Sequence, residues 1–225
     1  MAFRLAQLRR LKTPNPYAHL ILNDLKDWVY DEETAPHQRG LWAHLGFQQI
    51  LLELGTGNGL HFADLAQRNP ESLVLGLELK LKPVVQSIRR ALRGGMKNAR
   101  MIRYDVHQLG DVFRENEVDD LYLHFPDPWL SPRKPAHRMT ALENLKLLSR
   151  IQKPGALLEF KTDSAPLFEW SLQQIEISPY KTELLSFNWH HHPDSHGVLR
   201  TQFESLFARR GLPIHYALLR NQKNV

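Results

Sequence analysis

Three glycines within five residues directly follow an apolar run, and this junction limits the possible folds more than any other feature. The run at residues 50–54 has the length of a buried strand, and Gly55, Gly57 and Gly59 precede a segment with helical spacing. Glycines at such a strand-to-helix turn let the backbone bend sharply and approach a ligand closely. The sequence therefore predicts a strand, a binding loop and a helix in succession.

Further apolar runs extend this unit into a sheet. Strands separated by helix-length stretches are predicted at residues 73–78, 100–105, 120–125 and 156–161. The last third is expected to hold helices at 164–177 and 201–210 and strands at 181–189 and 213–220. This pattern predicts an α/β fold with a seven-stranded, mostly parallel sheet covered by helices on both faces.

The N-terminal region has a different pattern. Pro14, Pro16 and Pro36 interrupt regular structure, so residues 1–45 are expected to form an extension with one helix at 18–30, ahead of a main domain at 46–225. The absence of cysteine excludes disulfides and thiolate metal sites. No segment has the pattern of a secretion signal or the length of a membrane span, so a cytoplasmic protein without membrane association is expected.

Positive charge is concentrated in one stretch. The chain has 29 basic and 24 acidic residues, a net charge of +5, and residues 78–103 contain eight basic residues against the single acid Glu78. Such a cluster favours a polyanionic partner such as nucleic acid. A solvated basic helix face is the alternative that charge alone leaves open.

Three acidic residues lie in or directly at the ends of the predicted strands, at the carboxyl edge of the sheet where ligands bind in such folds. Glu78 ends the second strand, where it could accept hydrogen bonds from ribose hydroxyls and would repel a phosphate. Asp105 ends the third strand and could receive an adenine amino group. Glu53 lies inside an apolar strand, where it needs a partner, either a ligand amino group or loop amides. Because Leu60 replaces the last glycine of a dinucleotide motif, S-adenosylmethionine is favoured over NAD.

A turn with two prolines follows the fourth predicted strand. Pro126 and Pro128 restrict the backbone on either side of Asp127 and so hold its carboxylate with little freedom. This placement suits a catalytic group, while a purely structural turn is the alternative. The residues His190, His191 and His192 are adjacent on the chain and cannot all face one ion, so no metal site is expected.

Several motifs together resemble the bacterial tRNA (guanine-N7-)-methyltransferases. In that family's order the chain carries the glycine loop, Glu78, Asp105, Phe125-Pro126-Asp127-Pro128-Trp129, Thr162-Asp163 and Thr201-Gln202-Phe203-Glu204. The resemblance runs from about residue 50 to residue 220. It implies a Rossmann-like class I methyltransferase that transfers a methyl group from S-adenosylmethionine to N7 of a guanosine in the variable loop of tRNA, position 46.

The resemblance also implies roles for individual residues. The residues that it implies for cofactor binding are Glu53, Gly55, Gly57, Gly59, Glu78, Asp105 and Asp127, and it implies that Asp127 is also catalytic. The residues that it implies for substrate binding are Arg133, Arg138, Asp163, Thr201, Gln202, Phe203 and Glu204. Asp163 could instead cap the following helix. Ser131 departs from the family, which has a lysine there, and Lys134 could replace that lysine in space.

Two other functions stay open at this point. One is an S-adenosylmethionine-dependent methyltransferase that acts on another RNA or on a small molecule, which the change at Ser131 favours. The other is a catalytically silent RNA-binding relative, against which the four acids Glu53, Glu78, Asp105 and Asp127 argue. The oligomeric state and the particular tRNA substrates do not follow from the sequence.

Overall fold

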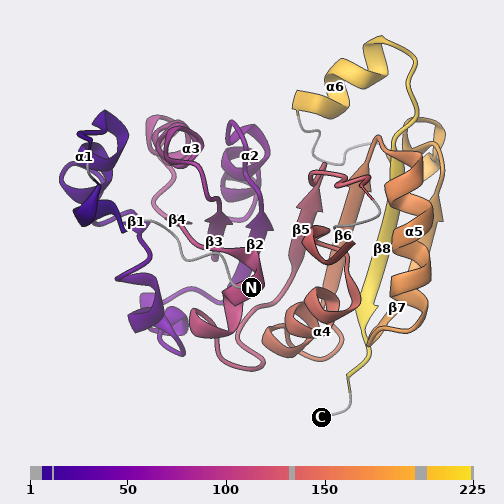
Figure 1. The fold of residues 1–225 in the computed structure, drawn as a ribbon, viewed down its shortest axis with the longest axis horizontal. Coiled ribbons are helices and arrows are strands. Elements are labelled where there is room, and N and C mark those ends of the chain that lie inside the picture. The colour runs from indigo at the N-terminus through magenta and orange to yellow at the C-terminus, as the bar shows by residue number, and fades with distance from the viewer. Residues whose placement is uncertain (1–6, 12, 132–134, 196–201, 224–225) are drawn as a thin grey trace.

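One mixed sheet organises the computed structural model, which describes residues 7–11, 13–131, 135–195 and 202–223 (Figure 1). The strands lie in the order β1-β4-β3-β2-β5-β6-β8-β7. Their bounds are β1 Val29–Tyr30, β2 Gln49–Leu54, β3 Ser72–Leu77, β4 Ala99–Ile102, β5 Leu121–His124, β6 Leu157–Thr162, β7 Tyr180–Ser186 and β8 His215–Asn221.

Strand direction agrees with the sequence-based expectation. The neighbouring strands from β1 to β6 are parallel, whereas β8 is antiparallel to both β6 and β7. The predicted mostly parallel α/β fold is therefore confirmed. The sheet has eight strands rather than seven because Val29 and Tyr30 pair with Met101 and Ile102 of β4.

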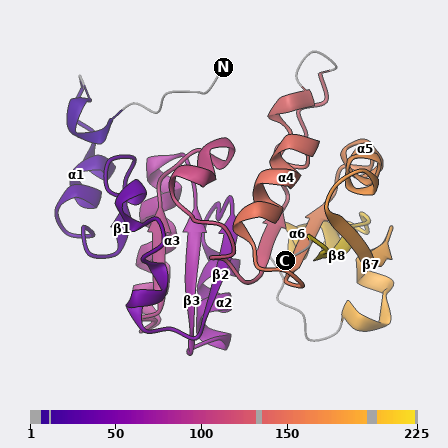
Figure 2. The ribbon, with the colours of Figure 1, turned by 90° about the horizontal axis from the view of Figure 1, so that it is seen from below.

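Helices cover both faces of the sheet, as Figure 2 shows. One face packs against α1 Pro16–Leu22, α2 Leu60–Arg68 and α3 Leu81–Arg93, and the other against α4 Leu142–Ile151 and α5 Ala165–Glu176. Side chains of β2 alternate between the two cores, since Leu52 packs with α4 and α5 while Leu51 packs with α2 and α3. Burial on both faces explains why the strands are apolar throughout.

The N-terminal helix is shorter than predicted. The expected helix at residues 18–30 is wrong in its second half, because α1 ends at Leu22. Asn15 caps its start by accepting from the amides of Tyr17 and Ala18, and the side chain of Asn23 donates to the carbonyl of His19 at its end. Turns then lead to β1.

The carboxyl ends of the parallel strands share one edge of the sheet, and helix α6 Gln202–Arg209 lies beyond that edge (Figure 1). Short 3₁₀ helices connect the other elements at Leu8–Arg10, Ala35–Gln38, Trp42–Leu45, Val106–Asp111, Pro135–His137, Trp189–His191 and Pro193–Ser195. No helix within the described residues is long and apolar enough to cross a membrane.

Candidate active site

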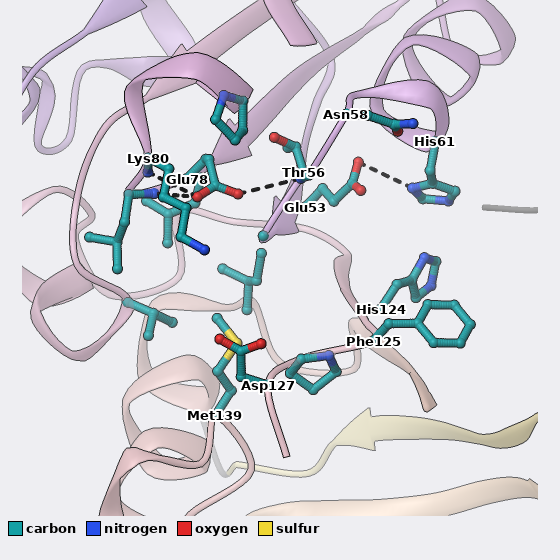
Figure 3. Close-up of a pocket in the computed structure, with 18 of the residues that line it drawn as sticks. Glu53, Thr56, Asn58, His61, Glu78, Lys80, His124, Phe125, Asp127 and Met139 are labelled. Atoms are coloured by element: carbon teal, nitrogen blue, oxygen red, sulfur yellow. Dashed lines mark hydrogen bonds and ion pairs between the residues drawn. The ribbon is translucent and has the colours of Figure 1, made fainter. Parts of the chain in front are cut away.

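A cavity of about 390 Å³ opens at the carboxyl ends of β2, β3 and β5 (Figure 3). It lies where the strand order reverses, because β3 follows β2 on one side and β5 pairs with β2 on the other. Ligands of open α/β sheets bind at such a reversal point. Its polar lining residues include Glu53, Asn58, His61, Glu78, Lys80, His124 and Asp127.

The glycine loop forms one wall of this cavity. Gly55 and Gly57 have positive φ angles of 84° and 53°, and a Cβ atom at either position would meet nothing within 4 Å. Gly59 is required for a different reason, since its Cβ would lie 2.4 Å from Cα of Ser87 in α3. The loop therefore leaves room for a ligand at its first two glycines and packs tightly on α3 at the third.

Glu78 follows β3 and faces the glycine loop. Its Oε1 accepts from the amides of Leu79 and Lys80 at 2.9 and 3.0 Å, and its Oε2 accepts from the amide of Gly57 at 3.4 Å. These bonds fix the carboxylate at the cavity wall, as Figure 3 shows. The side chain is positioned to accept hydrogen bonds from ribose hydroxyls.

Asp105 is placed differently from the other predicted cofactor residues. Its neighbours Tyr104 and Val106 line the cavity, whereas Asp105 does not. The side chain is buried, and Oδ1 accepts from the amide of His107 at 3.0 Å, which caps the 3₁₀ helix after β4. Its contact with an adenine amino group stays a prediction.

Glu53 has a protein partner that the sequence did not reveal. Its Oε2 lies 3.1 Å from Nδ1 of His61 at the start of α2, and both side chains are 3% exposed (Figure 3). Burial disfavours the charged imidazole, but the Glu53 carboxylate outweighs burial and raises the pKa of His61. The buried carboxylate is thus stabilised at the wall of the cavity.

The turn after β5 carries the predicted catalytic carboxylate. Phe125 and Trp129 have positive φ angles of 50° and 40°, a region that residues with side chains rarely adopt. The amide of Phe125 donates to the carbonyl of Lys161 at 2.8 Å, which ties the turn to β6. Asp127 is exposed between these points and lines the cavity. A strained, fixed turn of this kind is typical of functional sites.

Of the two predicted substrate arginines, only Arg138 is described. Its side chain is buried: Nε donates to the carbonyl of Trp129 at 3.2 Å, and the guanidinium lies 4.3 Å from the ring centroid of Trp170. Arg138 thereby supports the turn that carries Asp127. Arg133 and Lys134 lie outside the described residues, so their roles stay predictions.

The remaining predicted substrate residues lie near β6 and α6. Asp163 is exposed directly after β6, and Ser164 rather than Asp163 caps α5 by accepting from the amide of Leu167. Glu204 of α6 is buried, and its Oε2 lies 3.4 Å from Nζ of Lys161. Thr201 and the side chains of Gln202 and Phe203 lie outside the described part of the structure, so their contacts with the substrate stay predictions.

Several polar side chains in and next to the cavity were not predicted as site residues, among them His61, His124 and the neighbouring pair Glu159 and Lys161. Nε2 of His124 lies 2.7 Å from Oε1 of Glu159, and Nζ of Lys161 lies 3.2 Å from the same oxygen. A signal was present in the sequence, because Glu159 and Lys161 alternate with apolar residues in a strand buried on both faces. Buried charges of this kind need partners.

Three arginines of the basic stretch after β3 make contacts within the protein. Arg90 donates to the carbonyl of Asn58, the guanidinium of Arg100 lies 4.3 Å from the ring centroid of Trp28, and Arg103 pairs with Glu32. Exposed basic side chains remain at Lys80, Lys82, Arg89, Arg93 and Lys97. These five residues form the basic surface of the α3 region.

The fold and cavity define a class I methyltransferase domain, and solved structures agree with this class. The 16S rRNA methyltransferase KamB matches with a TM-score of 0.61 over 86% of this chain and 95% of that chain, at 17% identity. A mutant 16S rRNA (adenine(1408)-N(1))-methyltransferase from Catenulisporales acidiphilia, solved with cosubstrate SAM, matches with a TM-score of 0.55 and 15% identity. The match covers 84% of this chain and 92% of that chain. At these identities the likeness concerns the fold.

Sequence comparisons identify the family. A family model described as "Putative methyltransferase" matches residues 47–217. A tRNA (guanine-N(7)-)-methyltransferase of Bdellovibrio bacteriovorus is 41% identical over 208 residues, which cover 90% of this chain and 96% of that protein. One from Lachnoclostridium phytofermentans is 29% identical over 210 residues, 92% of this chain and 96% of that protein. The chain belongs to the tRNA (guanine-N7-)-methyltransferase family, as its motifs indicated.

Proposed function

We propose that this protein transfers a methyl group from S-adenosylmethionine to N7 of a guanosine in tRNA. One observation carries the proposal: the turn that exposes Asp127 opens into the same cavity as the glycine loop and Glu78. The relative from Bdellovibrio bacteriovorus, 41% identical and named for this activity, supports the same reaction.

The cavity fits S-adenosylmethionine on the evidence of its own residues. Gly55 and Gly57 leave open space beside the loop, and Glu78 presents a fixed carboxylate suited to ribose hydroxyls. Glu53 lies at the wall with His61, where a carboxylate suits a ligand ammonium group. The bound cofactor would supply the electrophilic methyl group.

The reaction requires little acid or base chemistry from the protein. Guanine N7 has an in-plane lone pair and no proton, so no general base is needed, and the product base is a cation. The protein must align the acceptor with the methyl group, and alignment of this kind can contribute roughly 7–11 kcal/mol. The restricted turn around Asp127 meets this requirement.

Carboxylates near the acceptor would offset the positive charge that develops on the base. Asp127 and Asp163 leave adjacent strands at the same edge, because His124 and Lys161 are paired in register between β5 and β6. Asp163 is exposed and could accept from the guanine N1 and N2 hydrogens. In this proposal Asp127 serves the methyl transfer and Asp163 orients the base.

The finer features of the activity are also part of the proposal. The acceptor is the guanosine of the variable loop, and the basic surface of the α3 region contacts tRNA phosphates, which position RNA without reading its sequence. Residues 46–225 carry the cofactor and guanosine sites, with residues 1–45 as an extension. Action on tRNA implies a cytoplasmic location.

Methyl transfer to defined transcripts tests the proposal. The purified protein is incubated with labelled S-adenosylmethionine and an unmodified tRNA transcript, or with the same transcript carrying adenosine at the variable-loop position. We expect 7-methylguanosine, identified by nucleoside mass spectrometry, in the first transcript only. Equal labelling of both transcripts would reject the position, and cofactor binding without labelling of any tRNA would reject the substrate class.

A further inference from the structure

A continuous group of buried ionisable side chains leads from the cofactor cavity to α6. We call this group the buried charge network; its members are Glu53, His61, His124, Glu159, Lys161 and Glu204. Every member has a side chain at most 14% exposed. Ionisable groups are costly to bury, so each must be held by its neighbours.

The first half of the network lies in the cavity wall. Glu53 pairs with His61, and the rings of His61 and His124 meet edge to face with centroids 4.4 Å apart. Burial and the neighbouring His61 lower the pKa of His124 to about 3, so its ring is neutral. Nε2 of His124 therefore carries the proton and donates to Oε1 of Glu159 at 2.7 Å.

The second half centres on Lys161. Its side chain is 0% exposed, and Nζ lies between two carboxylates, 3.2 Å from Oε1 of Glu159 and 3.4 Å from Oε2 of Glu204. Oε2 of Glu159 accepts from the hydroxyl of Tyr216 at 3.3 Å. A buried ammonium needs such anionic partners, so Lys161 and Glu204 hold each other in place.

The position of Lys161 links the two halves of the active site. It lies in β6 two residues before Asp163, and its carbonyl accepts from Phe125 at the start of the turn that carries Asp127. Through Nζ it reaches Glu204 in α6, an element far along the chain. One residue therefore joins the turn through its carbonyl and α6 through its ammonium group.

We propose that Lys161 is a positioning residue that bridges Glu159 and Glu204 and so fixes α6 against the cofactor cavity. Glu204 then acts mainly through Lys161, by holding α6 beyond the carboxyl edge of the sheet, where the guanosine would bind. This inference rests on the proposed function for its effect on turnover, but the ion pairs that carry it are features of the free protein.

Matched variants test the bridge. Lys161→Met, Glu204→Gln and the double variant are compared with Lys153→Met, which breaks a lysine–carboxylate pair with Asp119 at the opposite end of the strands. We measure S-adenosylmethionine affinity and site number by calorimetry, turnover per cofactor-binding site with unmodified tRNA, and hydrogen exchange of α6 and β2.

We expect Lys161→Met to lower turnover per site about tenfold or more, because misplaced reacting groups react slowly. The KM for tRNA and the cofactor affinity should change by less than about threefold, since phosphate contacts supply most of the RNA affinity. Amides of α6 should exchange faster while those of β2 do not. The double variant should lose no more than Lys161→Met alone, which is the coupling expected of one shared interaction.

Several results would overturn the proposal. The first is full turnover per site in Lys161→Met. The second is a loss of turnover in the double variant equal to the product of the losses in the two single variants. The third is a loss of cofactor affinity in Lys161→Met as large as its loss of turnover. If Lys161→Met does not fold, Glu204→Gln must show the faster α6 exchange and the lower turnover per site. If the wild type does not methylate tRNA, the proposed function fails, and the α6 exchange rates still decide whether Lys161 fixes α6.

Discussion

His61 and His124 lie in the same wall of the cavity, but their surroundings drive their protonation in opposite directions. Burial opposes the charge on both rings. At His61 the adjacent Glu53 carboxylate prevails and raises the pKa, whereas at His124 burial and the neighbouring His61 prevail and lower the pKa to about 3. The wall therefore holds two adjacent imidazoles whose pKa values are shifted in opposite directions, between Glu53 and Glu159.

This difference gives His124 a predictable effect on stability. An unfolded chain has a histidine pKa near 6.5, so between about pH 6.5 and pH 3 the unfolded state binds a proton at His124 that the folded state does not. Stability must therefore fall as the pH falls through this window, by about 2 kcal/mol from His124 alone between pH 7 and pH 5. His124→Gln keeps an N–H donor and removes this titration.

Urea unfolding at pH 7 and pH 5 measures the effect. Between pH 7 and pH 5, the free energy of unfolding of the wild type should fall by about 2 kcal/mol more than that of His124→Gln. His61 is present in both proteins, so its effect on stability cancels in the comparison. That effect has the opposite sign: because the pKa of His61 is raised, it stabilises the folded state below pH 6.5, and the stabilisation is lost as the pH rises through the folded pKa. Equal pH dependence in both proteins would mean that His124 is not buried in its neutral form.

Asp127 is the residue whose loss should affect methyl transfer most. Asp127→Asn keeps the size of the side chain and the turn but removes the charge next to a base that becomes cationic. We expect kcat/KM to fall about 100-fold, the scale on which a preorganised electrostatic group acts. Steady-state methylation of tRNA measures this, with Glu176→Gln, an exposed carboxylate at the far end of α5, as the matched control. A variant with at least half of the wild-type rate would remove Asp127 from the mechanism.

At the scale of elements, α3 presents exposed basic side chains along one stripe. Lys82, Arg89 and Arg93 are exposed and recur at helical spacing, whereas Arg90 is used to hold the glycine loop. Exposed arginines and lysines on such a stripe suit RNA phosphates. Contacts with phosphates release counterions, so they make binding depend on salt.

Removing two of these charges should weaken tRNA binding and reduce its salt dependence. For Lys82→Ala with Arg89→Ala, the slope of log K against log salt should become less negative by about 1.4–1.8, because each phosphate contact contributes roughly 0.7–0.9. Fluorescence titration of tRNA at several salt concentrations measures the slope. Lys146→Ala with Lys181→Ala removes two exposed lysines elsewhere and should leave it unchanged. An unchanged slope in the α3 variant would place the RNA on another surface.

The elements were predictable where local pattern determines structure. Apolar runs bounded by turn residues indicated the strands β2 to β6. The expected start of the N-terminal helix at residue 18 was two residues late, because Pro16 was interpreted as an interruption, whereas it is the first residue of α1 and Asn15 caps it. The end of α1 was not predicted, because residues 23–30 keep apolar side chains for burial against the sheet while turns replace the helix. Pattern alone does not distinguish these two ways of burying apolar residues.

The candidate site was predictable only in part for a related reason. Glu53, Glu78 and Asp127 line the cavity, as expected from their places in or after strands that end at this edge of the sheet. The pairing of Lys161 with Glu204, and the packing of Arg138 on Trp170, join residues more than thirty positions apart and depend on strand register and loop course. Such contacts need the three-dimensional structure.

At the scale of the whole molecule, the buried carboxylate of Glu32 connects the N-terminal segment to the sheet, in addition to the apolar packing of that segment. Glu32 follows β1, accepts from the amide of Leu8 and pairs with Arg103 after β4. The side chains of Glu32 and Arg103 are 7% and 8% exposed. The pair thus connects the N-terminal segment, the edge strand and the sheet.

Breaking this pair should destabilise the protein far more than breaking a surface pair. Glu32→Ala removes the carboxylate that pairs with buried Arg103, and loss of one member of a buried ion pair typically costs about 3–5 kcal/mol. The control Glu143→Ala breaks an exposed pair with Lys146 and should cost about 1 kcal/mol or less. Thermal unfolding should show a Tm lower by about 10 °C for Glu32→Ala alone. Equal Tm values in the two variants would show that the N-terminal segment is not held by this pair.

In the proposed function the whole molecule brings guanine N7 of the tRNA variable loop to a methyl group in this cavity. The most direct measurement is to treat an unmodified tRNA transcript with the protein and S-adenosylmethionine, reduce the RNA and cleave it with aniline, which breaks the chain at 7-methylguanosine. We predict a single break at the variable-loop guanosine. Breaks at other guanosines, or an intact chain despite incorporated methyl groups, would contradict methylation of N7 at this guanosine.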